Sequence, residues 1–341
     1  MEAKQQSQRS GILAAGNWIV DHVKLIDAFP DQDALSFILS ESKSNGGGPY
    51  NVLKDLTMLG ADFPLQAAGL VGNDTDGQWI INDCRNLGIN TDRLALTSDV
   101  TTSYTDAMSV ESTGRRTFFH HVGANALLKG ADINLTESRA KFFYLGYLLL
   151  LESLDKVNDD GRTGASELLN EARALGFLTV VDLVSAQLGD FKSVVLPSLP
   201  EVNILLLNEL EAGALLGSIL DENDPGPLID ASRKILDLGV RDHVIVHSAS
   251  GVVAVSSDGN EVSQGSVQFP DDMIRGAAGA GDAFAAGFIM GLHEGKNLHE
   301  SLRWGVCSAA SCLTDPTTSG GILQLSDSLL LGEQFGFREF Q

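Results

Sequence analysis

The chain has 341 residues, of which 43% are apolar, so it can bury a sizeable core in one large domain. Its 23 Lys and Arg residues stand against 45 Asp and Glu residues, which gives a formal net charge of −22. This charge opposes non-specific attraction to nucleic acids and anionic membranes, and no apolar run is long enough to span a bilayer. We therefore expect no nucleic-acid partner and no membrane contact. Because residues 1–10 lack the apolar core of a signal peptide, we also expect a cytoplasmic protein.

The first part of the chain predicts alternating strands and helices. After residues 1–10, which we expect to form a disordered tail, residues 12–16 form a buried strand that ends in a turn. A glycine-rich loop at residues 46–48 precedes a helix whose apolar residues recur every three or four positions until Gly60. A strand at residues 65–71 and a helix at residues 75–87 follow.

The pattern changes near residue 100, where two strand-like runs and a turn predict a β-hairpin at residues 103–120. Strands and helices alternate again after this hairpin, with strands at residues 141–145, 178–183, 203–208 and 244–246 and helices near residues 161–175, 227–238 and 298–314. Right-handed crossovers then give a central, mainly parallel sheet covered on both faces. Ligands of such a fold bind at the carboxyl ends of the strands. We expect residues 331–341 to form a C-terminal tail.

The most informative stretch is the glycine-rich turn at residues 276–281, which leads into an apolar helix starting near Asp282. Glycines let successive backbone N–H groups approach a ligand, and the free N–H groups of a helix start bind anions. The same groups would keep the Asp282 carboxylate ionised and directed, so that it could accept a hydroxyl proton. The alternative is that Asp282 only caps the helix.

The run Gly279-Ala280-Gly281-Asp282, followed by a helix of small residues, resembles the second signature of the ribokinase/PfkB family of carbohydrate kinases. The resemblance covers about residues 11–325, with further motifs in the family's order at residues 16–21, 46–51, 123–125 and 208–211. It implies a ribokinase-like three-layer α/β/α sandwich at residues 11–330, with a mainly parallel central sheet and a small β lid. The lid segments would be residues 17–45 and 99–122.

The resemblance also implies ATP-dependent phosphorylation of a hydroxymethyl group on a sugar or sugar acid. Asp282 would be the catalytic base, and Gly279, Ala280 and Gly281 would stabilise the phosphoryl oxygens. The acceptor-binding positions correspond to Asn17, Asp21, Gly46, Gly47, Asn51, Asn125 and Arg116. The nucleotide-binding positions correspond to Asn208, Ser248, Gly251, Gly279, Gly281 and Ser319. Asn208 and Glu211 would hold Mg²⁺ through water, whereas helix capping is the alternative for this pair.

The chain departs from the family just before its second signature. Where many members carry an aspartate and a threonine that help to hold a monovalent cation, this chain has Gly276 and Ala277, so we expect only a weak dependence on K⁺. Two alternative functions stay open: a nucleoside kinase of the same fold, favoured slightly by the spacing from Gly16 to Asp21, and a non-catalytic sugar or nucleotide sensor. A homodimer that forms through the lid is a further hypothesis. The acceptor stays unidentified, because the residues that select it lie in the lid.

Overall fold

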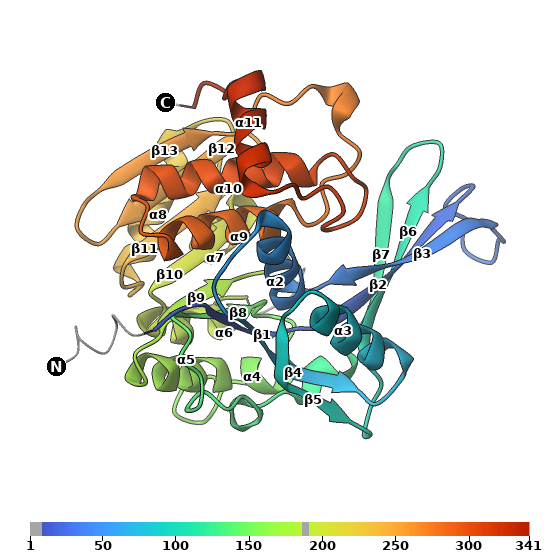
Figure 1. Ribbon diagram of the computed structural model, residues 1–341, viewed down its shortest axis with the longest axis horizontal. Coiled ribbons are helices and arrows are strands. Elements are labelled where there is room, and N and C mark those ends of the chain that lie inside the picture. The colour runs from blue at the N-terminus through green and yellow to red at the C-terminus, as the bar shows by residue number, and fades with distance from the viewer. Residues whose placement is uncertain (1–8, 186–190, 341) are drawn as a thin grey trace.

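The computed structural model describes residues 9–185 and 191–340. Its centre is a nine-stranded sheet with the order β13-β12-β11-β10-β9-β8-β1-β4-β5 (Figure 1). The strands are β1 (Ile12–Gly16), β4 (Leu65–Gly72), β5 (Asn90–Thr97), β8 (Phe142–Gly146), β9 (Leu178–Asp182), β10 (Ile204–Asn208), β11 (His243–His247), β12 (Gly251–Ser256) and β13 (Glu261–Gly265). Every pairing from β11 to β5 is parallel, and β12 and β13 continue the sheet as antiparallel strands. The structure thus confirms the predicted mainly parallel sheet.

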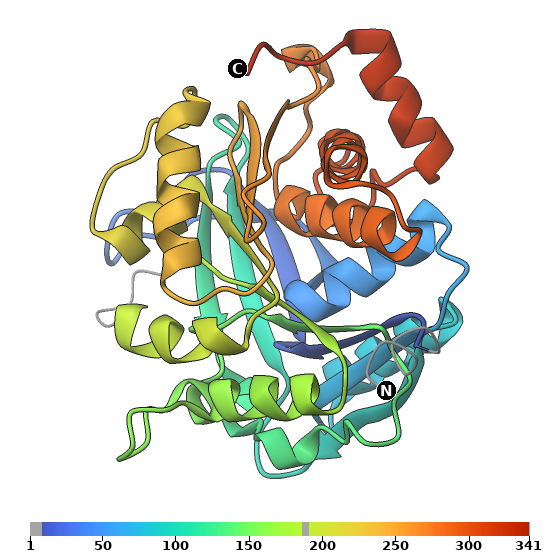
Figure 2. The same cartoon turned by 90° about the vertical axis from the view of Figure 1, so that its left-hand side faces the viewer.

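Helices cover both faces of this sheet, which gives three layers (Figure 2). Ile12 and Ala14 of β1 pack into one hydrophobic cluster, whereas Leu13 and Ala15 pack into the other, as strand alternation requires. Helices of the first cluster are α2 (Gly48–Leu59), α3 (Thr75–Asn86), α9 (Ala280–His293), α10 (Leu298–Cys312) and α11 (Leu325–Phe335). Helices of the second cluster are α4 (Glu152–Asp155), α5 (Gly164–Ala174), α6 (Phe191–Val195), α7 (Glu209–Leu216) and α8 (Pro225–Asp237). Short 3₁₀ turns lie at Gly123–Leu127, Gly130–Asp132, Leu196–Glu201 and Asp271–Met273.

A second, four-stranded sheet with the order β3-β2-β6-β7 projects from one side of the body (Figure 1). It consists of β2 (Ile19–Ile26), β3 (Ile38–Gly46), β6 (Ser103–Val110) and β7 (Arg116–His121). The strands β6 and β7 are the predicted hairpin. This small sheet is built from the two segments that we expected in the lid, and its action as a lid stays a prediction.

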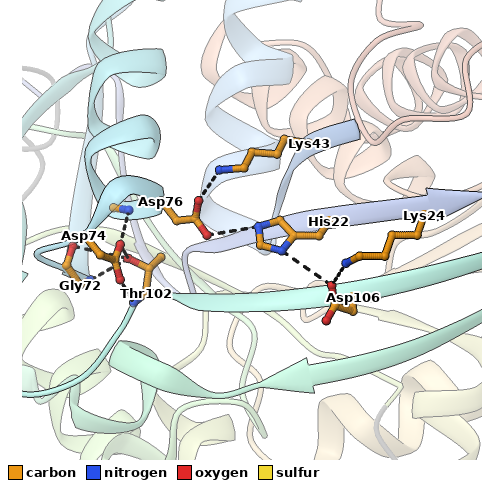
Figure 3. Close-up of polar contacts among 9 residues, drawn as sticks. His22, Lys24, Lys43, Gly72, Asp74, Asp76, Thr102 and Asp106 are labelled. Atoms are coloured by element: carbon orange, nitrogen blue, oxygen red, sulfur yellow. Dashed lines mark hydrogen bonds and ion pairs between the residues drawn. The ribbon is translucent and has the colours of Figure 1, made fainter. Parts of the chain in front are cut away.

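Charged side chains join the small sheet to the start of α3 (Figure 3). His22 of β2 lies 3.2 Å from the Asp76 carboxylate of α3, which also forms an ion pair with Lys43 of β3. On the other side of the imidazole, Asp106 of β6 pairs with His22 and with Lys24. These contacts lie on the face of the small sheet that carries His22 and Lys24.

The structure corrects both expected chain ends. We expected residues 1–10 to form a disordered tail, and residues 1–8 lie outside the described residues. Arg9, in contrast, packs against the domain, with its guanidinium carbon 4.2 Å from the centre of the Phe177 ring. The boundary expected after residue 330 is wrong, because α11 continues to Phe335 and Phe340 is only 3% exposed. Among the described helices, none has the length and apolar character needed to cross a bilayer.

One helix begins later than the sequence suggested. The helix expected from residue 161 begins at Gly164, because the Thr163 side chain caps it by accepting from the Ser166 N–H group.

Candidate functional site

Asp282 lies in the first turn of α9, directly after the glycine turn. Gly279 has a φ of 82°, and a Cβ there would lie 2.2 Å from the Thr318 carbonyl oxygen, so the turn requires glycine. No acceptor in the described part of the chain takes the N–H groups of Gly281 and Asp282. The N–H group of Ala280 differs from our expectation, since it donates to the Ala277 carbonyl at 3.3 Å. The N–H groups of Gly281 and Asp282 can therefore donate to an anion at the start of α9.

The Asp282 carboxylate is 5% exposed and is held by two donors from other elements. The Tyr147 hydroxyl donates to Oδ1 at 2.5 Å, and the Asn51 amide donates to Oδ2 at 2.8 Å. Burial raises the pKa of Asp282 to about 6, while the two hydrogen bonds oppose this rise. At pH 7 the group is mainly ionised, and it can take up a proton from a hydroxyl.

Residues of helix α2 and of the strand before it lie next to the Asp282 side chain. Asn51 lies in its first turn, and Asn45 donates one amide hydrogen bond to the Asn51 oxygen at 2.7 Å and another to the Ser319 hydroxyl at 3.0 Å. One turn further along α2, Asp55 is fully buried, and neither of its carboxylate oxygens has a hydrogen-bond partner of ordinary geometry among the described residues. Burial raises the pKa of Asp55 well above its usual value, and the nearby Ser319 hydroxyl offsets this only in part.

Asn17 and Asp21 face the same region from the turn after β1 and from β2. The Asn17 oxygen accepts from the Tyr147 N–H group at 2.7 Å, whereas its amide nitrogen is buried without a partner in the described part of the chain. A Cβ at Gly46 would lie 2.7 Å from the Asp21 carboxylate, so glycine makes room for this group. Burial raises the pKa of Asp21 to about 7, and the charge of Asp282 adds to this rise. Gly47 is the N-cap residue of α2 beside them.

Three other predicted site residues are engaged with the protein itself. The Asn125 side-chain oxygen accepts from the Trp18 N–H group at 3.0 Å, and its amide nitrogen donates to the Trp18 carbonyl at 3.3 Å. Asn125 therefore stabilises the turn after β1. Arg116 of β7 donates to the Pro316 carbonyl at 2.9 Å and reaches Asp21 only through its charge. Ser319 is 1% exposed, and its hydroxyl accepts from the Asn45 amide at 3.0 Å, so its assignment to the nucleotide stays a prediction.

Two cavities meet at His247 and Gly281. The first has a volume of about 400 Å³ and is mainly apolar, and Ser248 and Gly251 are among the residues that line it. The apolar residues of this cavity include Val252, Val267, Phe269, Phe284, Ala310 and Leu313. The second cavity, of about 440 Å³, contains Asp282 and the glycine turn together with Asn208 and Glu211. The two cavities suit an apolar ring and an anionic chain of one elongated ligand.

Asn208 and Glu211 form the capping arrangement that was the alternative for this pair. The Asn208 oxygen accepts from the Glu211 N–H group at 2.8 Å, and the Glu211 carboxylate accepts from the Asn208 N–H group at 2.9 Å and from Ser185 at 2.9 Å. Burial raises the pKa of Glu211. Because protein donors already occupy much of the carboxylate, a hydrated cation fits here better than a directly bound one. Within residues 9–185 and 191–340, no three His, Cys, Asp or Glu side chains could hold a metal together.

The sequence did not single out three residues of this site: Tyr147, Asp182 and His247. Tyr147 follows the end of β8, whereas Asp182 and His247 are the last residues of β9 and β11. Asp182 accepts from the Tyr144 hydroxyl at 3.0 Å, and burial raises its pKa well above the usual value. Burial lowers the pKa of His247 to about 4, so its ring is neutral at pH 7. The rule that ligands gather at strand ends would have pointed to all three.

Comparison with known proteins finds a matching family and related chains. The model of the pfkB family carbohydrate kinases matches residues 15–324. A 5-dehydro-2-deoxygluconokinase of Clostridium beijerinckii is 24% identical over 297 residues, which cover 82% of this chain and 83% of the relative.

Two ribokinase structures share the fold. The crystal structure of ribokinase from Thermotoga maritima is similar with a TM-score of 0.77 and 22% identity, covering 95% of this chain and 99% of that chain. The ribokinase of Arabidopsis thaliana complexed with ribose and ATP also has a TM-score of 0.77, with 18% identity and coverage of 95% and 98%.

Proposed function

Because the chain belongs to the pfkB family of carbohydrate kinases, we propose that it transfers the γ-phosphoryl group of ATP to a hydroxymethyl group of a sugar or sugar acid, with Asp282 as the base. One observation carries this proposal. A buried, mainly ionised carboxylate stands beside the N–H groups of Gly281 and Asp282, which have no acceptor in the described part of the chain, in a cavity that joins an apolar one. A proton acceptor and an anion site are the two parts that phosphoryl transfer to an alcohol needs.

In the proposed reaction, the hydroxyl oxygen attacks the γ-phosphorus while the bond to the β-phosphate oxygen breaks. Asp282 takes the hydroxyl proton, so the products are ADP and a phosphorylated sugar. The N–H groups of Gly281 and Asp282 stabilise charge on the transferred oxygens. Asn51 and Tyr147 keep the carboxylate directed. The amide nitrogen of Asn17, which has no partner among the described residues, can donate to an acceptor hydroxyl, and the Asp21 carboxylate can accept from one.

ATP fits the paired cavities, with adenine in the apolar one and phosphates in the polar one. The related Arabidopsis ribokinase was solved with ribose and ATP, which supports this choice of nucleotide. Asn208 and Glu211 would hold Mg²⁺ through water, and the cation would supply positive charge that neutralises the phosphates in a chain of net charge −22. The predicted weak dependence on K⁺ belongs to the same proposal, since Gly276 supplies no carboxylate.

The small sheet carries exposed apolar side chains at both of its edges. Large apolar side chains of β7 and of the β2–β3 end are exposed to solvent: Phe37 by 65%, Ile38 by 53%, Phe118 by 59% and Phe119 by 52%. Exposed apolar side chains at both edges of a sheet are candidates for contact with another chain. We propose a homodimer through this sheet. Equilibrium sedimentation would support it if the mass is twice 36.2 kDa, and a monomer at all concentrations would contradict it.

Acceptor profiling tests the proposed function. The protein would be incubated with ATP, Mg²⁺ and a panel of sugars, sugar acids and nucleosides, and ADP release would be measured together with the phosphorylated product. Phosphorylation of a sugar or sugar acid supports the proposal, and selective phosphorylation of nucleosides supports the alternative nucleoside kinase. Binding of sugars without phosphorylation would favour a sensor.

A further inference from the structure

A row of charged and polar side chains crosses three strands of the small sheet, on the face that meets α3 (Figure 3). In the register of this sheet, Lys43 of β3 lies opposite His22 of β2, and His22 lies opposite Asp106 of β6. Residues that lie opposite each other in a sheet share one face. Asp76, in the first turn of α3, contacts this row from outside the small sheet.

Asp76 joins two of these strands to the body of the domain. One of its carboxylate oxygens accepts from Nε2 of His22 at 3.2 Å, and the other forms an ion pair with Nζ of Lys43. Nδ1 of the same imidazole lies 3.7 Å from Asp106, which also pairs with Lys24. The Asp76 side chain is 19% exposed, and charges that are partly withdrawn from water are screened less than exposed ones. Asp76 is therefore a fixed point at which α3 holds β2 and β3.

The start of α3 also holds the small sheet where β6 begins (Figure 3). Asp74, the N-cap residue of α3, accepts from the N–H group and from the hydroxyl of Thr102, both at 2.7 Å, and Thr102 directly precedes β6. His22 lies three residues beyond Ile19, where β2 begins, which is roughly 10 Å along the strand. Because Asp74 holds the base of the sheet and Asp76 holds it further out, the two contacts together oppose tilting of the sheet.

The opposite face of β2 carries Asp21. Successive side chains of a strand point to opposite faces, so Asp21 points away from α3 while its neighbour His22 points toward it. Asp21 faces the candidate site, since its pKa is raised by burial and also by the charge of Asp282. The two neighbours share a peptide bond, so a displacement of His22 moves Asp21 as well. The place of the Asp21 carboxyl thus depends on what holds His22.

On the Asp21 face, the small sheet is held at its edges. The Ser44 hydroxyl of β3 lies 3.2 Å from the Thr318 hydroxyl, and Arg116 of β7 donates to the Pro316 carbonyl at 2.9 Å. The strand β2 lies between β3 and β6. Among residues 9–185 and 191–340, the bond from His22 to Asp76 is the one hydrogen bond that joins a side chain of β2 to an element outside the small sheet.

We infer that Asp76 is a positioning residue for the acceptor: through His22 and Lys43 it holds β2 and β3 so that Asp21 reaches an acceptor hydroxyl. This inference rests on the proposed function, in which Asp21 accepts from such a hydroxyl. Asp76 itself lines neither cavity of the candidate site. Its loss should therefore weaken acceptor binding and leave both ATP binding and the turnover of bound acceptor nearly unchanged.

The test is Asp76→Asn, assayed with ATP, Mg²⁺ and the sugar or sugar acid of the panel above that gives the highest kcat/KM. The acceptor KM should rise about three- to tenfold, whereas kcat and the KM for ATP should stay within about twofold. Asp76→Glu keeps the carboxylate and should recover part of the loss. If Asp76→Asn does not fold, Lys43→Met removes the partner on β3 and leaves α3 unchanged. Glu201→Gln is the matched control, because Glu201 is also 19% exposed and pairs with Arg173 away from both cavities.

A double-mutant cycle with Asp21→Asn decides whether Asp76 acts through Asp21. If it does, Asp76→Asn should change the acceptor KM less than twofold once Asp21 has been replaced. Amide hydrogen exchange adds a measurement that needs no turnover: the amides of β2 should exchange faster in Asp76→Asn than in the native protein, and at the native rate in Glu201→Gln.

The outcomes separate the inference from the proposed function. The inference is overturned and the proposed function stands if the native protein phosphorylates an acceptor but Asp76→Asn leaves its KM unchanged, lowers kcat alone, or raises the KM equally with and without Asp21. Unchanged exchange in β2 overturns it as well. If the native protein phosphorylates no acceptor of the panel, the proposed function fails and the inference fails with it.

Discussion

Replacing Tyr147 by phenylalanine should raise the pKa of Asp282 and shift the acid side of the pH–activity profile to higher pH. The Tyr147 hydroxyl donates to the Asp282 carboxylate at 2.5 Å, and this bond favours the ionised form. A hydrogen bond to a charged group contributes about 1.5–3 kcal/mol, and one pKa unit corresponds to about 1.4 kcal/mol. The pKa of Asp282, about 6 in the native protein, should therefore rise by roughly one to two units in Tyr147→Phe.

The expected loss of activity depends on pH. With a pKa of about 6, roughly nine-tenths of Asp282 is ionised at pH 7, and this share falls to about half or a tenth after the shift. We expect kcat/KM at pH 7 to fall about two- to tenfold and to recover near pH 9, where the carboxylate is ionised again.

The assay is kcat/KM measured from pH 5 to 9.5. Tyr144→Phe is the matched control, because the Tyr144 hydroxyl donates to Asp182 at 3.0 Å and has no bond to Asp282. A profile that does not move in Tyr147→Phe, or a loss that persists at pH 9, would refute this account of the Asp282 pKa.

Three further predictions follow from the site. Glu211→Gln should raise the Mg²⁺ concentration for half-maximal activity more than the acceptor KM, and identical Mg²⁺ titrations would contradict this role. Asp55→Asn should raise the free energy of unfolding by about 1 kcal/mol or more in urea titrations, because it removes a fully buried carboxyl that has no hydrogen-bond partner of ordinary geometry among the described residues. Since the pKa of Asp55 is higher in the folded than in the unfolded protein, this gain should be larger at pH 8 than at pH 4, and a loss of stability would contradict it. Because Gly276 supplies no carboxylate, activity at constant ionic strength should differ little between K⁺, Na⁺ and a bulky organic cation, whereas strong activation by K⁺ alone would reveal another ligand.

Sequence motifs located the parts of the site that depend on a local turn. Gly279 and Asp282 belong to one turn and one helix start, and Asn51 follows its own glycine loop, so spacing along the chain determines their geometry. The Tyr147 and His247 side chains could not be placed this way. They meet Asp282 only because β8 and β11 end at the same edge of the sheet.

The direction in which a side chain points could not be predicted from the sequence either. Asn125 and Ser319 lie in segments that the resemblance placed at the site, yet their polar atoms are used by the Trp18 backbone and by Asn45. The sequence of β3 has no clear strand pattern of alternating apolar and polar residues. Residues 38–43 are all exposed, so they lack the alternation of a half-buried strand. The mainly parallel central sheet, in contrast, follows from the regular alternation of strands and helices, and the structure confirms it.

The variant Asp282→Asn tests the central claim most directly. The amide preserves the shape of the side chain and removes the proton acceptor, so kcat should fall by about 10²-fold or more at every pH, while ATP affinity and the free energy of unfolding stay close to those of the native protein. Turnover of ATP with the best acceptor should be measured together with ATP binding by calorimetry. A variant that binds ATP normally and turns over at a near-native rate would contradict the assignment of Asp282 as the base.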